Sequence, residues 1–461
     1  MLATIPSMGS ARWVVVGAGS AGCVVASRLS EDPDRSVVLL EAGSIGLDGA
    51  LPAAIAGPSF FAALAEPGAT YEHLVASRTR GGSLAPYPRG RGLGGSSLVN
   101  AMVALDADPA TMPGVAGAEL AAARRAVALV LEKPSHAELG PIDQCLLAAA
   151  PDAERALLTR KGGRRYTSAE AYLRPAVGRD NLTIRVGALV DRVEFDGRRA
   201  LGVRLADGEL VDADHVVLAA GAIHTPAVLL RSGVDTPGVG EGLQDHPSAR
   251  FALQLRDVAA ATADGLVVGS LLRRDPIQFL PLNHHGVAGF AALLVALMRP
   301  VGRHGRVRLA DDDPASEPIV DFALLEEPGD LAALGVGVRE ALDLLRTPPF
   351  DEVVTEVHLD GLDDAGTTAA ALEDDASIDE WLRRSVVDYV HATGTCAMGA
   401  VVDDHGRLRG YDGVLVCDAS VFPTIPDVNT HLPTTVMAEA LTARWRADRG
   451  PSATRPQQTD P

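Results

Sequence analysis

Cysteine and aromatic residues are scarce in this chain, and the few cysteines limit the kinds of site that it can carry. Aromatic residues make up only 4% of its 461 residues. Four cysteines stand far apart with no C-x-x-C pair, so neither a redox dithiol nor a zinc ribbon is indicated, and we predict no metal site. Isolated cysteines also fit a reducing, cytoplasmic setting. The four are Cys23, Cys145, Cys396 and Cys417.

Positive charge and long apolar runs are lacking as well. The chain has 60 acidic against 41 basic residues and a net charge of −19, which disfavours nucleic acid and anionic membranes as partners. No run of 18 apolar residues occurs, so we expect no membrane span. The first ten residues lack a basic segment followed by an apolar one, so no signal peptide is expected. Lysine is nearly absent and Ala and Gly abound, a bias typical of a GC-rich bacterial genome. The polar, proline-rich residues 447–461 are expected to be disordered.

The most informative stretch is residues 13–43, which predicts a strand, a glycine turn, a helix and a second strand. A run of valines ends in Gly17, Gly19 and Gly22, the G-x-G-x-x-G spacing. In such a motif the first glycine makes a tight turn and the second lets the backbone approach a pyrophosphate. The third lets the helix pack on the strand, and the helix N-terminus offers free N–H groups to phosphates. We interpret this stretch as a dinucleotide site; the alternative is a structural turn of the same shape.

An acidic residue supports the dinucleotide interpretation. Glu41 ends the second strand, 19 residues past Gly22, where a carboxylate accepts hydrogen bonds from adenosine ribose hydroxyls. The same charge repels a 2′-phosphate, so NADP is disfavoured. No second fingerprint and no redox dithiol occur, which argues against a flavoenzyme reduced by NAD(P)H.

A second glycine-rich stretch, residues 86–103, reads P-Y-P-R-G-R-G-L-G-G-S-S-L-V-N-A-M-V. Its backbone could hold an anion and a flat ring, or it could be a surface loop; its composition alone leaves both open.

The remaining patterns predict an α/β chain with an inserted α+β layer. Helices are expected over 118–131, 142–158, 328–345 and 377–385, and one starting near Pro433. An antiparallel meander is expected over 182–186, 188–195 and 200–205, and a buried strand over 215–219. Pro226 is expected to open a helix after that strand, and a last strand covers 414–417.

Four blocks in fixed order resemble the glucose–methanol–choline (GMC) family of FAD-dependent oxidoreductases. They are Gly17–Glu41, Arg89–Met102, Gly221–Gly233 and His391–Asn429 with the helix after it. The resemblance spans nearly the whole chain. It implies a Rossmann-like FAD-binding domain (10–104, 178–247 and 386–446) and a substrate-binding domain of antiparallel sheet and helices (105–177 and 248–385).

The resemblance also implies roles for individual residues. It makes His391, in H-A-T-G-T, and Asn429 the catalytic pair. Some members attach FAD through a histidine just before the loop asparagine; Val99 stands there, which implies non-covalent FAD. The implied FAD contacts are Gly17, Gly19, Ser20, Ala21, Gly22, Glu41, Ala42, Arg89, Gly94, Ser96, Asn100, Ala101, Met102, Val103, Val190, Asp418, Ala419, His431 and Pro433. His224 and His246 lie in nucleotide-domain motifs, where we expect structural roles.

The expected activity is oxidation of an alcohol to a carbonyl, with hydride moving to flavin N5 and His391 as general base. Electrons would leave to oxygen or another acceptor. The alternatives are a lyase of the same family with redox-inert FAD, a flavin-binding subunit of a larger complex, and an NAD-linked dehydrogenase. The chain departs from the family after the first motif, where A-L-D-A-D-P leaves little room for a lid. The site is therefore expected to be more open or covered by another chain.

Overall fold

A five-stranded parallel sheet carries the first glycine motif. The computed structural model describes residues 11–47, 49–257, 265–359 and 367–448. The strand order is β22-β13-β1-β2-β9, so the strand before the glycines lies at the centre, and every neighbouring pair is parallel. Its apolar run is buried on both faces, as a central parallel strand requires. The strands are β1 (Ala11–Val16), β2 (Arg35–Leu40), β9 (Leu182–Arg185), β13 (His215–Leu218) and β22 (Val414–Val416).

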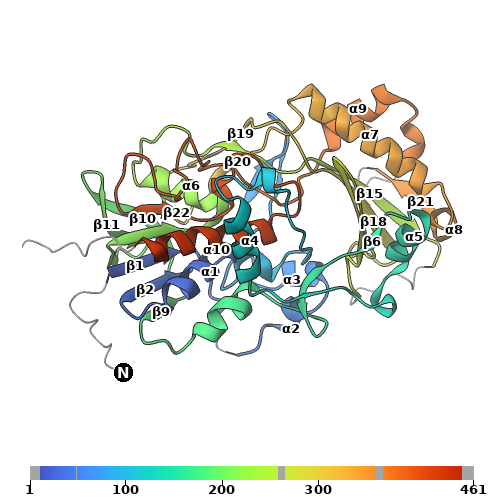
Figure 1. Ribbon diagram of the computed structural model, residues 1–461. Coiled ribbons are helices and arrows are strands. Elements are labelled where there is room, and N and C mark those ends of the chain that lie inside the picture. The colour runs from blue at the N-terminus through green and yellow to red at the C-terminus, as the bar shows by residue number, and fades with distance from the viewer. Residues whose placement is uncertain (1–10, 48, 258–264, 360–366, 449–461) are drawn as a thin grey trace, which may run out of the picture.

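Two helices from opposite ends of the chain pack together beside this sheet (Figure 1). Helix α1 (Ser20–Leu29) contacts α10 (His431–Ala447), which in turn contacts α4 (Gly117–Ala126). Arg28 of α1 donates two hydrogen bonds, of 2.9 and 2.8 Å, to the carboxylate of Glu439 in α10. An antiparallel meander of β10 (Val190–Asp196), β11 (Arg199–Leu205) and β12 (Leu210–Asp212) lies against β13 and β1.

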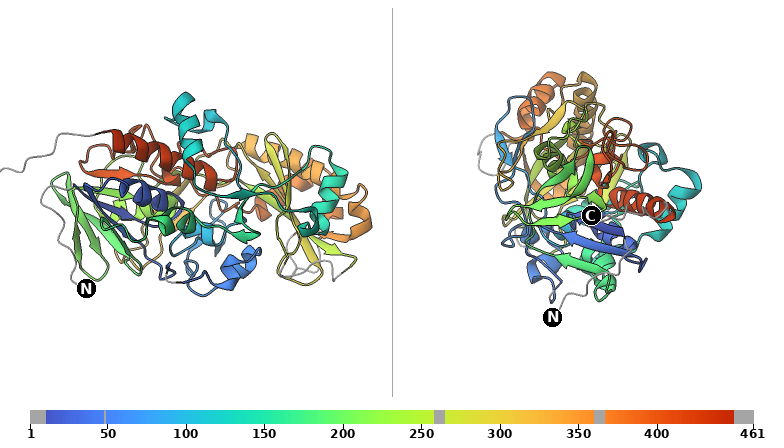
Figure 2. Two further views of the ribbon diagram at one scale, coloured as in Figure 1. Left: turned by 60° about the horizontal axis from the view of Figure 1, so that its bottom comes forward. Right: turned by 90° about the vertical axis from the view of Figure 1, so that its left-hand side faces the viewer.

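A six-stranded antiparallel sheet forms the other end of an elongated molecule (Figure 2). Alternate side chains of its central strands, such as Phe251 and Phe279, are fully buried in a cluster that also contains residues of α7. In order across the sheet, the strands are β21 (Val354–His358), β15 (Ser248–Leu255), β18 (Phe290–Leu297), β17 (Ile277–Leu282), β16 (Ser270–Arg274) and β6 (Glu154–Arg155). The helices of this end are α5 (Pro141–Ala149), α7 (Pro328–Leu345), α8 (Phe350–Val353) and α9 (Asp375–Ser385).

A third, mixed sheet draws its strands from distant parts of the chain. It contains β14 (Glu241–Leu243), β19 (Gly305–Arg308), β20 (Ile319–Asp321), β3 (Val75–Ser77) and β4 (Leu84–Pro86). Strand β15, which follows β14 in the chain, belongs to the six-stranded sheet. Helix α6 (Gly221–Arg231) contacts both β10 of the meander and β19 of this third sheet.

The predicted fold class, a Rossmann-like α/β sheet with an antiparallel sheet and helices, is confirmed. So are the strands at 14–16 and 37–40 and the helix at 328–345, whose bounds match α7. The helix predicted near Pro433 starts two residues earlier, at His431.

Several predicted elements are wrong in detail. Residues 182–185 form β9, an edge strand of the parallel sheet, and are not part of the meander, because they pair with β2. Pro226 lies inside α6, which already begins at Gly221. The helices predicted over 118–131 and 142–158 end at Ala126 and Ala149, where the chain turns into short strands whose backbones pair with distant partners.

No helix within the described ranges is both long and apolar enough to cross a membrane. Of the tail predicted to be disordered, residues 449–461 lie outside the described residues, and Ala447 is the last residue of α10.

Candidate active site

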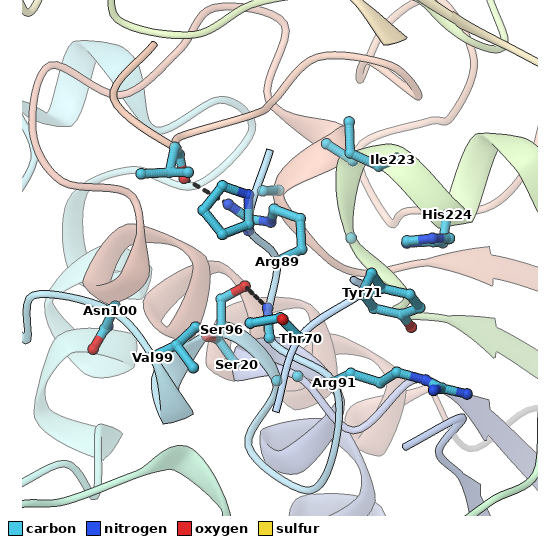
Figure 3. A pocket seen from close by; sticks show the side chains of 18 of the residues that line it. Ser20, Thr70, Tyr71, Arg89, Arg91, Ser96, Val99, Asn100, Ile223 and His224 are labelled. Atoms are coloured by element: carbon cyan, nitrogen blue, oxygen red, sulfur yellow. Dashed lines mark hydrogen bonds between the residues drawn. The ribbon is translucent and has the colours of Figure 1, made fainter. Parts of the chain in front are cut away.

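A cavity of about 750 Å³ is lined by the glycine motif, by the loop at 88–103, by the C-terminal block and by the six-stranded sheet. Figure 3 shows Ser20, Ser96 and Asn100 on one side of this cavity and Tyr71 and His224 on another side. The rings of Tyr71 and His224 are stacked with centroids 4.2 Å apart. The predicted motifs, which are far apart in the sequence, therefore meet at one cavity.

The first glycines hold the backbone against its neighbours. A Cβ on Gly22 would lie 1.9 Å from the carbonyl oxygen of Gly17, so only glycine lets α1 start this close to β1. Gly17 itself has φ +91°. No side chain caps the N-terminus of α1, and Gly19, Ser20 and Ala21 line the cavity. The free N–H groups of this first turn suit an anion such as a pyrophosphate.

Glu41 joins three loops through its buried carboxylate. One oxygen accepts from the N–H of Ala18 at 2.8 Å, and the other accepts from Gly43 and Gly92, both at 2.9 Å. Burial raises the pKa of Glu41, while these three hydrogen bonds oppose that rise. Glu41 also lines the cavity, where a ligand could reach it. Its contact with a ribose stays a prediction.

The second glycine-rich stretch is not a free surface loop, because it packs directly on the first. A Cβ on Gly95, whose φ is +52°, would lie 2.6 Å from Cα of Gly19. The N–H of Gly94 donates to the carbonyl of Ala18 at 2.8 Å. Beyond it, Met102 lines the cavity with φ +63°, a left-handed conformation that non-glycine residues rarely adopt. Such local strain is typical of functional sites.

A buried arginine that no sequence pattern indicates holds this loop. The guanidinium of Arg165 donates to the carbonyl of Ile55, and to both the side chain and the backbone carbonyl of Asn100, the latter two at 2.7 Å. Burial without an acidic partner lowers the pKa of Arg165 to about 9. Nothing in its sequence context, R-R-Y-T-S, distinguishes it from a surface arginine.

The start of α10 brings a third segment to the cavity. Nδ1 of His431 is hydrogen-bonded to the hydroxyl of Ser20 at 2.8 Å, which ties α10 to the glycine motif. Nε2 of His431 is buried and has no hydrogen-bond partner. Burial, with the charge of Arg165, lowers the pKa of His431 to about 4, so its ring is neutral. A buried ring nitrogen left without a partner on a cavity wall fits a polar ligand that would satisfy it.

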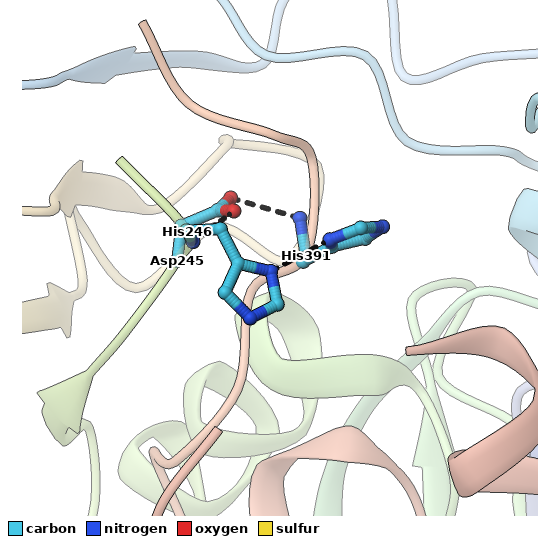
Figure 4. Close-up of side chains that lie close together, drawn as sticks. All are labelled: Asp245, His246 and His391. Carbon is cyan, nitrogen blue, oxygen red and sulfur yellow. Dashed lines mark hydrogen bonds between the residues drawn. The ribbon is translucent and has the colours of Figure 1, made fainter. Parts of the chain in front are cut away.

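His391 lines the same cavity, and its backbone is held by a buried carboxylate (Figure 4). Oδ2 of Asp245 accepts from the N–H of His391 and from the hydroxyl of Tyr87, both at 2.9 Å. Oδ1 accepts from the N–H groups of His246 and Tyr389. The ligand atoms of Asp245, His246 and His391 lie within 4.8 Å of one another. That spacing resembles a metal site, but each Asp245 oxygen already accepts two hydrogen bonds.

The ring of His391 is oriented by a second histidine. Nδ1 of His391 lies 2.9 Å from Nδ1 of His246, and Nε2 of His246 lies 3.0 Å from the carbonyl oxygen of Pro426. Burial lowers the pKa of His246 to about 3, so its ring is neutral and carries one proton. A carbonyl only accepts, so that proton is on Nε2, and Nδ1 of His246 accepts from Nδ1–H of His391. Nε2 of His391 is thereby left with a free lone pair, as a general base requires.

Asn429 reaches the cavity from the segment before α10 and is linked to His391 through two side chains. Its Oδ1 accepts from Nε2 of Gln278 at 3.3 Å, and the same Nε2 donates to the hydroxyl of Tyr389 at 3.0 Å. The Tyr389 and His391 rings have centroids 4.9 Å apart. With its oxygen bound to Gln278, Asn429 has its NH₂ group left to donate.

The structure brings nearly all predicted site residues to this cavity. His391 and Asn429 line it, as do all predicted FAD contacts except Gly22, Gly94 and Pro433. Gly22 packs against the backbone of Gly17, and Gly94 is hydrogen-bonded to Ala18, so both support residues that line the cavity. Pro433 is buried in the first turn of α10. The four cysteines are free and buried.

Comparisons with known proteins point to one family. Two family models, both described as GMC oxidoreductase, match residues 151–248 and 300–438. A 5-(hydroxymethyl)furfural oxidase from Methylovorus sp. is 30% identical over 93% of this chain and 97% of its own length. An oxygen-dependent choline dehydrogenase from Chromohalobacter salexigens is 30% identical over 94% of each chain.

Solved structures share the fold. A pyridoxine 4-oxidase from Mesorbium loti superposes with a TM-score of 0.84 and 24% identity, over 96% of this chain and 100% of that one. A formate oxidase from Aspergillus oryzae does so with a TM-score of 0.83 and 20% identity, over 96% and 99% of the two chains.

Proposed function

This chain belongs to the GMC oxidoreductases, and from that premise we propose that it is an FAD-dependent enzyme that oxidises an alcohol to a carbonyl, with His391 as the general base. One observation carries the proposal: a histidine whose Nε2 has a free lone pair lines the same cavity as the glycine cradle. We also propose that the chain divides, as predicted from the sequence, into an FAD-binding domain and a substrate-binding domain.

The residues present fit FAD, the cofactor of this family. Two glycine loops touch where a Cβ would collide, and the uncapped N-terminus of α1 suits the pyrophosphate. The orphaned Nε2 of His431 suits a polar edge of the ring system. We propose that the glycine motif and Glu41 hold the adenosine half, and that residues 100–103 with His431 hold the flavin half. When bound, FAD accepts the two electrons of the alcohol carbon–hydrogen bond.

His391 must take the hydroxyl proton as that bond breaks. A hydroxyl with a pKa of about 15.7, like water, loses its proton to an ordinary histidine at a cost of roughly 12 kcal/mol. Burial and the charge of Arg89 lower the pKa of His391 further, so a free alkoxide is even less accessible. The NH₂ group of Asn429, donating to the same oxygen, would stabilise its developing negative charge.

We propose that FAD is held without a covalent bond and that oxygen or another acceptor reoxidises it. Val99, a buried cavity residue, offers no nucleophile at the position where some family members attach the flavin. Several relatives carry names that include "oxygen-dependent" or "oxidase", which supports oxygen as the acceptor.

Anaerobic stopped-flow mixing of the yellow holoenzyme with a panel of primary alcohols tests the proposal. We expect the flavin absorption to bleach with at least one alcohol and to return in air. A flavin that stays oxidised with every alcohol would favour the redox-inert lyase, and a colourless protein would exclude bound FAD.

A further inference from the structure

We propose that the alcohol oxidised here carries a carboxylate at its far end, and that Arg250 binds this group. The inference rests on the proposed function and concerns the substrate end of the same cavity. Arg250 is the third residue of β15 and lines the cavity together with Leu280, Leu282 and Leu294.

Arg250 is a partly buried cation without a counter-ion. Its guanidinium makes no hydrogen bond or ion pair with any residue in the described ranges, although it carries five N–H donors. Burial lowers its pKa, and no acidic side chain contributes to offset this. A partly desolvated arginine without a counter-ion is less stable than one in water, and a bound anion would offset that cost.

The acidic residues that line the same cavity already have other partners or, in the case of Glu72, are exposed to solvent. Asp388 is paired with Arg78. Glu317 is bonded to His224 at 3.0 Å. Asp418 accepts from Thr225 and from backbone N–H groups, Glu41 accepts from three backbone N–H groups, and Glu72 is exposed to solvent. The cation is therefore available to a ligand.

The strand register relates Arg250 to the reaction centre. Arg250 pairs with Leu294, which pairs with Leu280 on the next strand. Ser248, two residues before Arg250 on β15, lies on the same face of the sheet. The row of paired residues that starts at Ser248 ends at Gln278, whose side chain is hydrogen-bonded to Asn429. A step of two residues is roughly 7 Å along a strand.

The backbone of Ser248 also pairs with Val387, four residues before His391. A substrate with its hydroxyl between His391 and Asn429 therefore needs a spacer to reach Arg250, and the substrates tested below use one aromatic ring. The leucines named above, with Phe60 and Phe61, give that spacer an apolar wall.

A monoanionic carboxylate suits the site better than a phosphate dianion or a cation. One guanidinium supplies one positive charge and two parallel N–H donors, which match a carboxylate. Burial, together with Arg250, lowers the pKa of the neighbouring His285, so that ring adds no charge. Choline, named in several relatives, is a quaternary ammonium cation and would be repelled by Arg250.

Paired substrates test this directly. Holoenzyme is assayed with para-hydroxymethylbenzoate and with the amide of the same shape, para-hydroxymethylbenzamide. We expect kcat/KM to favour the carboxylate by about 10- to 100-fold, mainly through KM. Arg250→Leu should abolish this preference and Arg250→Lys should retain part of it. Arg308→Leu removes the same charge from an exposed position outside the cavity, and it should keep the wild-type preference.

Calorimetric titration of the holoenzyme with benzoate gives a readout without turnover. Benzoate should bind the wild type at least about tenfold more tightly than it binds Arg250→Leu. Equal kcat/KM for the carboxylate and the amide, or equal benzoate affinity in the two proteins, would overturn the inference and leave alcohol oxidation intact. If no alcohol bleaches the flavin, the proposed function fails, and the benzoate titration still decides whether Arg250 binds a carboxylate.

Discussion

The imidazoles of His246 and His391 meet edge to face at 89°, with their Nδ1 atoms 2.9 Å apart, although 145 residues separate them in the chain. The carbonyl of Pro426 on the far side of His246 sets the proton positions in both rings. His246 is buried and does not line the cavity, so any influence it has on the proposed reaction would pass through His391.

His246 is therefore expected to be a positioning residue. In His246→Leu, Nδ1–H of His391 loses its acceptor, and we expect flavin reduction to slow by about 10- to 100-fold. In His246→Asn the side-chain oxygen can accept at the place of Nδ1 and should restore much of the rate. Nitrogen-15 NMR of the imidazoles reports the tautomer of His391. A wild-type rate and tautomer in His246→Leu would contradict the role.

Replacing His391 itself should remove the base and leave the cofactor in place. We expect His391→Ala to reduce its flavin about 10²- to 10⁴-fold more slowly, with wild-type FAD content. Stopped-flow bleaching and the ratio of flavin to protein absorption measure the two. His136→Ala, at an exposed histidine that does not line the cavity, is the matched control. Loss of FAD with unchanged activity per bound flavin would refute the assignment.

The low pKa of His391 fixes the sign of its pH dependence. A general base works only when neutral, and burial together with the charge of Arg89 lowers the pKa of His391. The reduction rate should therefore stay constant from pH 9 down to about 6.5 and fall only below that. Arg89→Gln removes this charge and should move the acid limb to higher pH, whereas Arg80→Gln, at an exposed arginine, should not. An acid limb above pH 7 in the wild type would argue against His391.

Gly95→Ala should separate the two glycine loops. Its Cβ would lie 2.6 Å from Cα of Gly19, at a φ of +52°. We expect the free energy of unfolding to fall by on the order of 2 kcal/mol and FAD to be retained less well. Gly329→Ala, in the first turn of α7, meets no atom within 4 Å and has no positive φ, so it should be neutral or slightly stabilising. Wild-type FAD affinity in Gly95→Ala would count against this loop contact.

Acid precipitation tests the mode of FAD attachment. With Val99 where a histidine would be needed, we expect trichloroacetic acid to leave a colourless pellet and a yellow supernatant. Pigment that stays with the pellet would mean that another residue forms a covalent bond.

Local patterns were sufficient for the parts of the fold that depend on neighbouring residues. The valine run before Gly17 predicted the central strand, because a strand covered on both faces must be apolar throughout. The helix at 328–345 was predicted to the residue, since its ends and its length are written in local sequence. Residues 182–185 were misassigned because alternation does not tell which sheet a strand joins.

The sequence by itself determined which residues are predicted to share a site: the glycine motif, His391 and Asn429. Its long motifs stand in the same order as those of the GMC family, and that resemblance assigns all of them to one site. Their roles in binding and catalysis stay predictions. Only the tertiary structure decided which groups surround them. The alternation of side chains along β15 predicts that Arg250 and Ser248 share one face of the strand. It does not predict that this face lines a cavity. Likewise, the bond between His246 and His391 depends on the packing of segments 145 residues apart, which no local pattern records.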